Sequence, residues 1–172
     1  MGMDVYGVAP KCEQGRYFRR SSWGWKPLWQ YCEDQHPEIA ELIESPFTND
    51  GDGLNDQDAV RLANRLIADI ESGIAADYIS ARNVIISATP NDKCECCEGT
   101  GVRRDQVGVD MMMPEKELPR DVGVRLGRSC GWCNECGGEG ETASPYTYYK
   151  LEIDDIIEFA VFAARSGGFR IF

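Results

Sequence analysis

The chain has 172 residues, of which 42% are hydrophobic, enough for one compact domain with a small appendage. It carries 29 acidic and 18 basic side chains, which gives a formal net charge of −11. This charge disfavours phosphate-driven binding to DNA or RNA and docking on an anionic membrane, and it suits a protein partner with a basic surface.

The sequence gives no sign of export or of membrane insertion. No apolar run approaches the roughly 20 residues of a membrane-spanning helix. The first ten residues, MGMDVYGVAP, lack the basic start and the apolar centre of a signal peptide. We therefore expect a cytoplasmic, reducing environment, in which the eight cysteines are metal ligands or free thiols rather than disulfides.

The first 56 residues predict short strands followed by a helix in two pieces. Residues 1–30 place aromatic side chains between turn residues, which is typical of short strands. Residues 25–45 predict the helical pieces, with Pro27 and Pro37 each in a first turn. Residues 47–56, FTNDGDGLND, are rich in turn formers and predict a break.

The clearest predicted helix begins after Asn55, which can cap it. Its apolar residues recur at helical spacing on one face, namely Ala59, Leu62, Ala63, Leu66, Ile67 and Ile70. Ser72-Gly73 interrupts this pattern, and a second helical face, which includes Ile74, continues to about Ala88. We therefore predict two consecutive helices.

The C-terminal segment predicts a strand, a helix and a second strand. Residues 146–153, YTYYKLEI, alternate in the manner of a strand. Residues 154–168 predict a buried helix, with acidic residues in the first turn and glycines after the last. The final residues, 168–172, predict a closing strand.

Two segments of the chain repeat the pattern Cys-x-x-Cys-x-Gly-x-Gly, CECCEGTG from residue 94 and CNECGGEG from residue 133. Two residues between cysteines allow a tight turn that points both thiolates at one metal ion, and two such turns complete a tetrahedral site. The glycines let the backbone turn back around the metal. We predict one structural Zn²⁺, because the protein fills all four coordination positions. The predicted ligands are Cys94, Cys97, Cys133 and Cys136, and the predicted turn glycines are Gly99, Gly101, Gly138 and Gly140.

This repeat resembles the cysteine-rich zinc-binding region of DnaJ-type co-chaperones. That family has four repeats for two zinc ions, so the two repeats here imply one. The resemblance covers residues 94–140 only, and His36-Pro37 is followed by Glu38, so the His-Pro-Asp tripeptide of a J-domain is missing. The resemblance implies a zinc fold without chaperone activity. More loosely, MGMDVYG, WGWKPLWQYC and SGGF are similar to segments of small uncharacterised proteins of bacteria and phages, which would imply a host protein as partner.

Two further cysteines lie beside the predicted ligands. Cys96 is inside the first pair, and Cys130 extends the second pair to Cys-x-x-Cys-x-x-Cys. Cys130 with Cys133 is an alternative ligand pair, but only Cys133 with Cys136 precedes Gly-x-Gly. Cys96 and Cys130 are either spare thiols in a reducing environment or a redox pair beside the zinc.

The inserted segment 102–129, between the two repeats, is the part of the sequence most typical of a partner-binding region. Met111, Met112 and Met113 are flexible and polarisable, which suits adaptable binding. Packing of these methionines against the helices is an equally good interpretation.

Three other signals favour structural interpretations. Residues 49–58, NDGDGLNDQD, fit no EF-hand register and predict a turn with a helix cap. The one histidine, His36, lies four residues after Cys32, and an ordinary half-exposed helical residue is favoured over a Cys-His site. Core packing is favoured over nucleic-acid stacking for three tryptophans near basic residues, Trp23, Trp25 and Trp29.

We predict an α+β protein with a mostly helical core of residues 1–93 and 142–172, and a projecting four-cysteine zinc finger of residues 94–141. No phosphate loop, serine elbow or dinucleotide fingerprint occurs, which argues against an enzyme. The predicted function is a small acidic protein-interaction module with a structural zinc, which regulates or inhibits a partner by occupying it. The alternatives are a thiol oxidoreductase using Cys96 and Cys130, and a nucleic-acid-binding zinc finger, which the charge disfavours.

Overall fold

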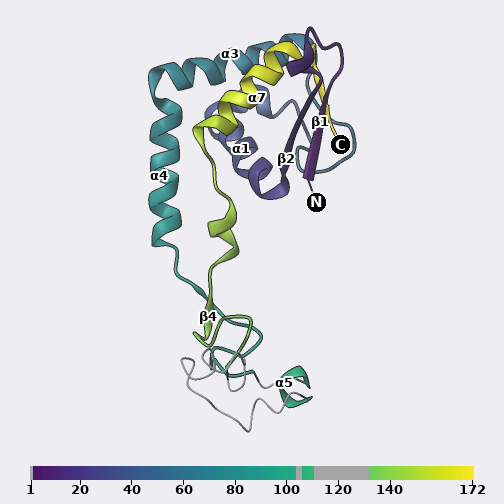
Figure 1. Ribbon diagram of the computed structural model, residues 1–172. Helices are drawn as coiled ribbons and strands as arrows, with labels where there is room; N and C mark the ends of the chain where they lie inside the picture. Colours follow the sequence, from purple (N-terminus) through teal and green to yellow (C-terminus); the bar gives the residue numbers. More distant parts are fainter. Residues whose placement is uncertain (1, 104–105, 111–131) are drawn as a thin grey trace. The chain divides into compact units, whose positions relative to one another are not determined.

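The computed structural model describes residues 2–103, 106–110 and 132–172 (Figure 1). The chain is α+β, as the sequence predicts, and it divides into two compact units. Unit 1 comprises Met1–Ser87 and Tyr148–Phe172, and unit 2 comprises Ala88–Thr147. In the described ranges, no helix combines the length and the apolar character needed to cross a membrane.

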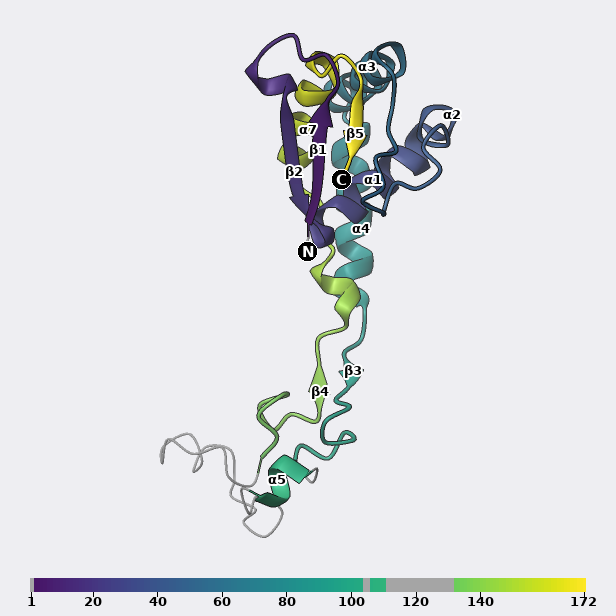
Figure 2. The same cartoon turned by 90° about the vertical axis from the view of Figure 1, so that its right-hand side faces the viewer.

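Unit 1 combines a small antiparallel sheet with helices. The sheet has the order β2-β1-β5, and Val5 of β1 lies opposite Phe18 of β2 and Ile171 of β5. Figure 2 shows the three strands side by side, with α7 behind them. The elements of this unit are β1 (Gly2–Gly7), η1 (Glu13–Gly15), β2 (Tyr17–Ser21), α1 (Ser22–Gln35), α2 (Pro37–Ala40), α3 (Asp56–Ser72), α4 (Ile74–Ala88), α7 (Ile153–Arg165) and β5 (Phe169–Ile171).

The start of α1 differs from the prediction. The Ser21 side chain at the end of β2 accepts a hydrogen bond of 3.2 Å from the Gly24 N–H and caps the helix there. Pro27 therefore lies inside α1 and not in its first turn, and the tryptophan-rich segment belongs to the helix rather than to strands. Pro37 does occupy the first turn of α2, as predicted.

Helix α3 matches the prediction at both ends. The Asn55 side chain accepts a hydrogen bond of 2.9 Å from the Asp58 N–H, and Gly73 ends the helix at a φ of 86°. The predicted apolar face is buried from Ala59 to Leu66, whereas Ile70 is partly buried and Ile67 is 38% exposed. Helix α4 leaves this turn in a new direction (Figure 1). Its predicted apolar face is covered only in part: Ala75 is buried and Tyr78 and Ile79 are partly buried against the core, whereas Ile74 and Ile85 are 44% and 58% exposed.

The strand predicted over residues 146–153 is wrong. Its first half forms the 3-10 turn η2 (Pro145–Tyr148), and its last residues lead into α7 through a capping box of Glu152 and Asp155. The aromatic alternation has another cause: the Tyr149 ring packs against Trp23, with centroids 4.8 Å apart. The helix and the final strand that follow, α7 and β5, confirm the prediction.

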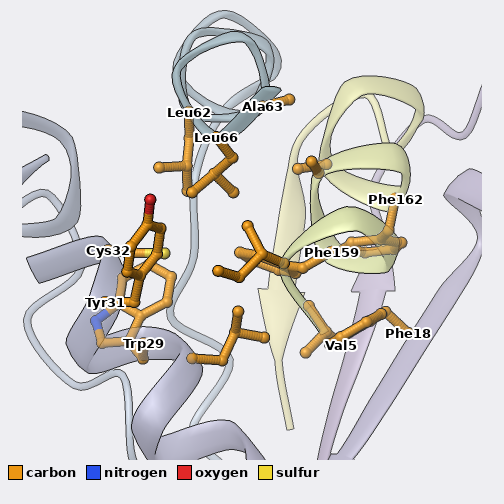
Figure 3. Close-up of a cluster of buried hydrophobic side chains, with 14 of the residues drawn as sticks. Val5, Phe18, Trp29, Tyr31, Cys32, Leu62, Ala63, Leu66, Phe159 and Phe162 are labelled. Atoms are coloured by element: carbon orange, nitrogen blue, oxygen red, sulfur yellow. The ribbon is translucent and has the colours of Figure 1, made fainter. Parts of the chain in front are cut away.

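The core of unit 1 combines aliphatic side chains with a group of aromatic rings that contact one another. Figure 3 shows side chains of α1, α3, α7 and the strands pointing into one interior. Trp25 and Trp29 stack with centroids 5.6 Å apart, and the Phe159 ring meets Trp25 edge-on at 5.5 Å. Each such pair contributes about 0.5–1.5 kcal/mol beyond its buried area. Trp25 and Trp29 thus pack the core, whereas Trp23 is 47% exposed.

The prediction of a half-exposed His36 is wrong, since the residue is 6% exposed. Its Nε2 lies 2.8 Å from a carboxylate oxygen of Asp69, which also accepts a hydrogen bond of 2.6 Å from the Tyr31 hydroxyl. Burial and this contact raise the pKa of Tyr31. The cluster joins α1 and the start of α2 to α3, so it acts as a buried structural link.

Candidate metal centre

The cysteine repeats of unit 2 are closed at their outer ends by a two-stranded ladder. Strands β3 (Asp92–Lys93) and β4 (Glu141–Thr142) pair antiparallel, with Lys93 opposite Glu141. This pairing brings the start of the first repeat beside the end of the second. A short helix, α5 (Gln106–Asp110), follows the first repeat.

Four buried thiols lie together between the two repeats. The Sγ atoms of Cys94, Cys97, Cys133 and Cys136 are all within 4.8 Å of one another. The Sγ atoms of Cys94 and Cys133 are 3.9 Å apart, and those of Cys97 and Cys136 are 3.8 Å apart. These separations are far longer than a disulfide bond of about 2.05 Å. Four buried cysteines are therefore close enough to hold one metal ion.

The two repeats form equivalent halves of this site. In the first, the Gly99 N–H donates to the Cys94 carbonyl at 3.1 Å, and in the second the Gly138 N–H donates to the Cys133 carbonyl at 2.9 Å. Each half also binds the other through its backbone, since the Cys133 N–H donates to the Gly101 carbonyl and the Cys94 N–H to the Gly140 carbonyl, at 2.6 and 2.9 Å. The sequence repeat is thus a local structural repeat.

Backbone N–H groups point at the sulfur atoms. The Gly101 N–H donates to Cys97 Sγ at 3.3 Å, and the Gly140 N–H donates to Cys136 Sγ at 3.2 Å. Such donors stabilise negative charge on sulfur, which a metal-binding thiolate carries. The sequence pattern did not predict these bonds, although the donor in each repeat is the second glycine of its Gly-x-Gly pattern, Gly101 or Gly140.

Two of the turn glycines are required by close packing as well as by backbone angle. Gly101 and Gly140 have φ values of 73° and 82°. A Cβ at Gly101 would meet the Gly138 carbonyl oxygen at 2.5 Å, and one at Gly140 would meet the Gly99 oxygen at 2.6 Å. Both distances are too short for any side chain. The two repeats can therefore approach this closely only with glycine at these positions.

The pKa values of the clustered thiols differ from one another. Burial raises the pKa of Cys133 to about 11. A hydrogen bond from the Cys97 N–H lowers the pKa of Cys94, but burial and the neighbouring thiols outweigh it and raise this pKa to about 11. For Cys97, burial is outweighed by the Cys94 thiol and the Gly101 N–H, which lower the pKa to about 7. Four thiolates in one buried site thus require a cation.

The donor set fits a tetrahedral thiolate site. Four sulfurs at about 2.3 Å from a central Zn²⁺ would be about 3.8 Å from one another. The two pairs described above have nearly this separation, and thiolate ligands favour soft or borderline ions such as zinc. Four cysteine ligands would leave no coordination position open on such an ion, which is typical of a structural site.

The other predicted site residues are only partly described. Cys96 packs against the four thiols and is half-buried, and its predicted partner Cys130 lies outside the described residues. Met111, Met112 and Met113 lie outside them as well, as does most of segment 102–129. The Cys32 thiol, in unit 1, is fully buried, and burial raises its pKa, so it offers no accessible nucleophile.

In the acidic loop of residues 49–58, the carboxylate of Asp52 accepts hydrogen bonds from backbone N–H groups. Asp52 accepts hydrogen bonds from the N–H groups of Glu44 and Ser45 at 2.8 and 3.0 Å, and one from the Gly53 N–H. Asn55 caps α3. This geometry is that of a turn with a helix cap, the interpretation favoured from the sequence.

Two of the basic residues near the tryptophans, Arg19 and Arg20, have acidic neighbours. Arg20 binds Asp155 at 2.8 Å and Glu158 at 2.5 Å, which fastens β2 to α7. Arg19 lies 3.4 Å from Asp4. Because these carboxylates neutralise the arginines, they weaken the case for a nucleic-acid surface at this place.

Comparison of the chain with protein-family models, with curated proteins and with solved structures found no match. The cysteine cluster therefore carries the functional argument by its own geometry.

Proposed function

We propose that the protein is a small protein-interaction module whose unit 2 is folded around one structural Zn²⁺. The observation that carries this proposal is the cluster of four buried thiols within 4.8 Å of one another. The resemblance of the repeats to the zinc-binding region of DnaJ-type co-chaperones supports the choice of zinc.

The metal is proposed as structural because unit 2 has little else to hold it together. Among the described residues of this unit, the one buried cluster of apolar side chains consists of the four cysteines, with Cys96 packed against it. A segment without a larger apolar core rarely folds alone, and metal binding then supplies the folding free energy. The bound ion would link the two repeats and fix the ends of the segment between them.

The interaction role rests on charge and on the absence of a reaction centre in the described site. The chain has a net charge of −11, which favours a partner with a basic surface. The four ligands would fill the coordination sphere of zinc, so no position remains for a substrate. Segment 102–129, between the repeats, is the proposed contact region, and the methionines at 111–113 are its proposed anchors.

Native mass spectrometry of the full chain tests the metal. The expected mass exceeds the sequence mass by one zinc, and Cys97→Ser removes this increment while Cys96→Ser keeps it. A protein with intact thiols that takes up no zinc, even when zinc is supplied, would falsify the central claim.

Affinity capture followed by identification of the partner tests the interaction. A Met111→Ala/Met112→Ala/Met113→Ala variant that still holds zinc is expected to lose the partner. Equal capture by this variant would assign the contact to another surface, and would leave the metal assignment intact.

A further inference from the structure

Unit 1 contains a cavity of about 510 Å³ that the metal site does not use. Its lining comes from Met3 of β1, from Ser22, Trp25 and Lys26 at the start of α1, from the loop of residues 47–49, and from Tyr149. Pockets for small ligands have volumes of roughly 300–1,000 Å³ and are mostly apolar, with a few polar groups. In size and lining the cavity resembles a binding pocket.

The wall formed by residues 47–49 is held in place by buried and backbone hydrogen bonds. The Trp25 indole N–H donates to the Pro46 carbonyl at 2.7 Å. In the two residues before Pro46, the N–H groups of Glu44 and Ser45 donate hydrogen bonds to the Asp52 carboxylate. The loop that carries Phe47 is therefore fixed without a ligand, and a preformed pocket loses little conformational entropy on binding.

Aromatic rings of the cavity are available for contact. The Phe47 side chain is 45% exposed, and Tyr149 is half-buried. Trp25 also lines the cavity and is itself almost completely buried. A flat apolar ligand would bury exposed ring surface here, at about 25 cal/mol per Å², and could make offset or edge-on ring contacts.

The charge of the cavity is opposite to that of the whole chain. None of its lining residues is acidic, although the sequence has 29 acidic side chains. Lys26 is the one charged residue of the lining, and its Nζ lies 5.0 Å from the centroid of the Tyr149 ring. Lys26 forms no ion pair with any residue that the structure describes. Ser22 is the first residue of α1, so the positive end of the helix dipole also faces this region.

We propose that this cavity binds a small aromatic anion. The ring of the ligand lies against Phe47 and Tyr149, and its carboxylate or sulfonate pairs with Nζ of Lys26. This site is independent of the zinc and of the partner proposed for unit 2.

Isothermal titration of the zinc-loaded full chain with 1-anilinonaphthalene-8-sulfonate tests the proposal, with neutral N-phenyl-1-naphthylamine as the matched probe. We expect one site that prefers the sulfonate. Lys26→Met should weaken sulfonate binding about three- to fivefold, the size of an exposed ion pair, and leave the neutral probe unchanged. Phe47→Ala should weaken both probes about tenfold. Lys11→Met, at an exposed lysine outside the cavity, should change neither.

The position of the probe is read from NMR spectra of the tryptophan indole groups. The Trp25 indole resonance should shift on titration, because its N–H anchors the cavity wall, whereas the Trp132 resonance of unit 2 should not. Equal affinity for both probes would overturn the preference for an anion, and an apolar protein side chain would then be the better candidate for the occupant. Binding that neither substitution weakens would overturn the site.

Discussion

The two units of the chain are stabilised in different ways. Unit 1 buries a continuous cluster of large side chains, in which Phe18, Trp25 and Phe159 contact one another as rings. The described part of unit 2 buries four thiols and little else. The folding free energy of unit 1 comes from apolar area buried by many residues. That of unit 2 would come mainly from a few bonds between sulfur and a metal ion.

This difference determines how each unit responds to damage. A core of many contacts loses a part of its stability with each substitution, because the remaining contacts persist. A metal site loses its function when one ligand or the ion is removed, because the remaining thiolates repel one another. The predictions below test this contrast, from the largest expected effect to the smallest.

The proposed structural zinc predicts that removal of the metal unfolds unit 2 and leaves unit 1 folded. Chelation of zinc, or Cys97→Ser, should abolish slow hydrogen exchange for the amides of Gly101 and Gly140, which donate to sulfur in the intact site. Amides of α3 and α7 should keep their protection. Hydrogen exchange followed by mass spectrometry measures both.

Cys96→Ser serves as the control for this experiment, since Cys96 packs beside the cluster without being one of the four clustered thiols. Its exchange pattern should match that of the natural protein. Loss of protection in both units on chelation would contradict the separation of the two modes of stabilisation.

Truncation of a core ring is expected to destabilise unit 1 and to leave zinc binding by unit 2 unchanged. Phe159 is fully buried and contacts Phe18, Trp25 and Phe169. Phe159→Ala should lower the free energy of unfolding of unit 1 by about 3–5 kcal/mol, through lost burial and a cavity. Chemical denaturation followed by tryptophan fluorescence measures this change. Zinc stoichiometry should stay the same, and zinc loss in this variant would show that unit 2 depends on unit 1.

Local patterns made much of this contrast predictable from sequence. The cysteine pairs and their glycines lie within eight-residue repeats, so spacing alone indicates the cluster. Helix α3 follows from its periodicity and its Asn55 cap for the same reason. Within each repeat, and within α3, the residues that decide the structure are neighbours in the chain, and the shared pattern of the two repeats pairs them across 39 positions.

Two of the errors concern contacts between distant residues. His36 and Asp69 are 33 positions apart, so nothing near His36 indicated its burial. The alternating tyrosines before α7 suggested a strand, but Trp23 provides their packing partner. The cavity likewise combines β1, α1, a loop and Tyr149, and no local pattern joins them.

Replacement of a glycine at the contact between the repeats should weaken the metal site without removing a ligand. Gly140→Ala places a methyl group 2.6 Å from the Gly99 carbonyl oxygen at a φ of 82°. We expect zinc affinity to fall about 10- to 100-fold, the usual effect of disturbing groups that orient ligands. Competition with a chromogenic chelator measures it.

Gly73→Ala is the matched control for this substitution. Gly73 has a similar φ of 86°, but a Cβ there would meet nothing within 4 Å. The control should leave zinc affinity unchanged and cost unit 1 about 1 kcal/mol of backbone strain. Equal zinc affinity in both variants would show that the close approach of the repeats is not required.

The smallest expected effect is a pH dependence of unit 1 at Asp52. Partial burial acts to raise the pKa of this carboxyl, but the N–H groups of Ser45, Gly53 and Glu44 outweigh it and lower the pKa. A lowered pKa in the folded state stabilises the fold above the unfolded-state value of about 3.9, and this stabilisation is lost as pH falls through the folded-state pKa. Asp52→Asn should therefore cost about 1 kcal/mol at pH 7. The difference from the natural protein should shrink below about pH 4, as measured by denaturation at each pH.

Asp50→Asn is the control, because its carboxylate accepts one long hydrogen bond of 3.4 Å and should contribute little. A difference at Asp52 that stays constant down to pH 2 would mean that the charge of the carboxylate does not hold the loop.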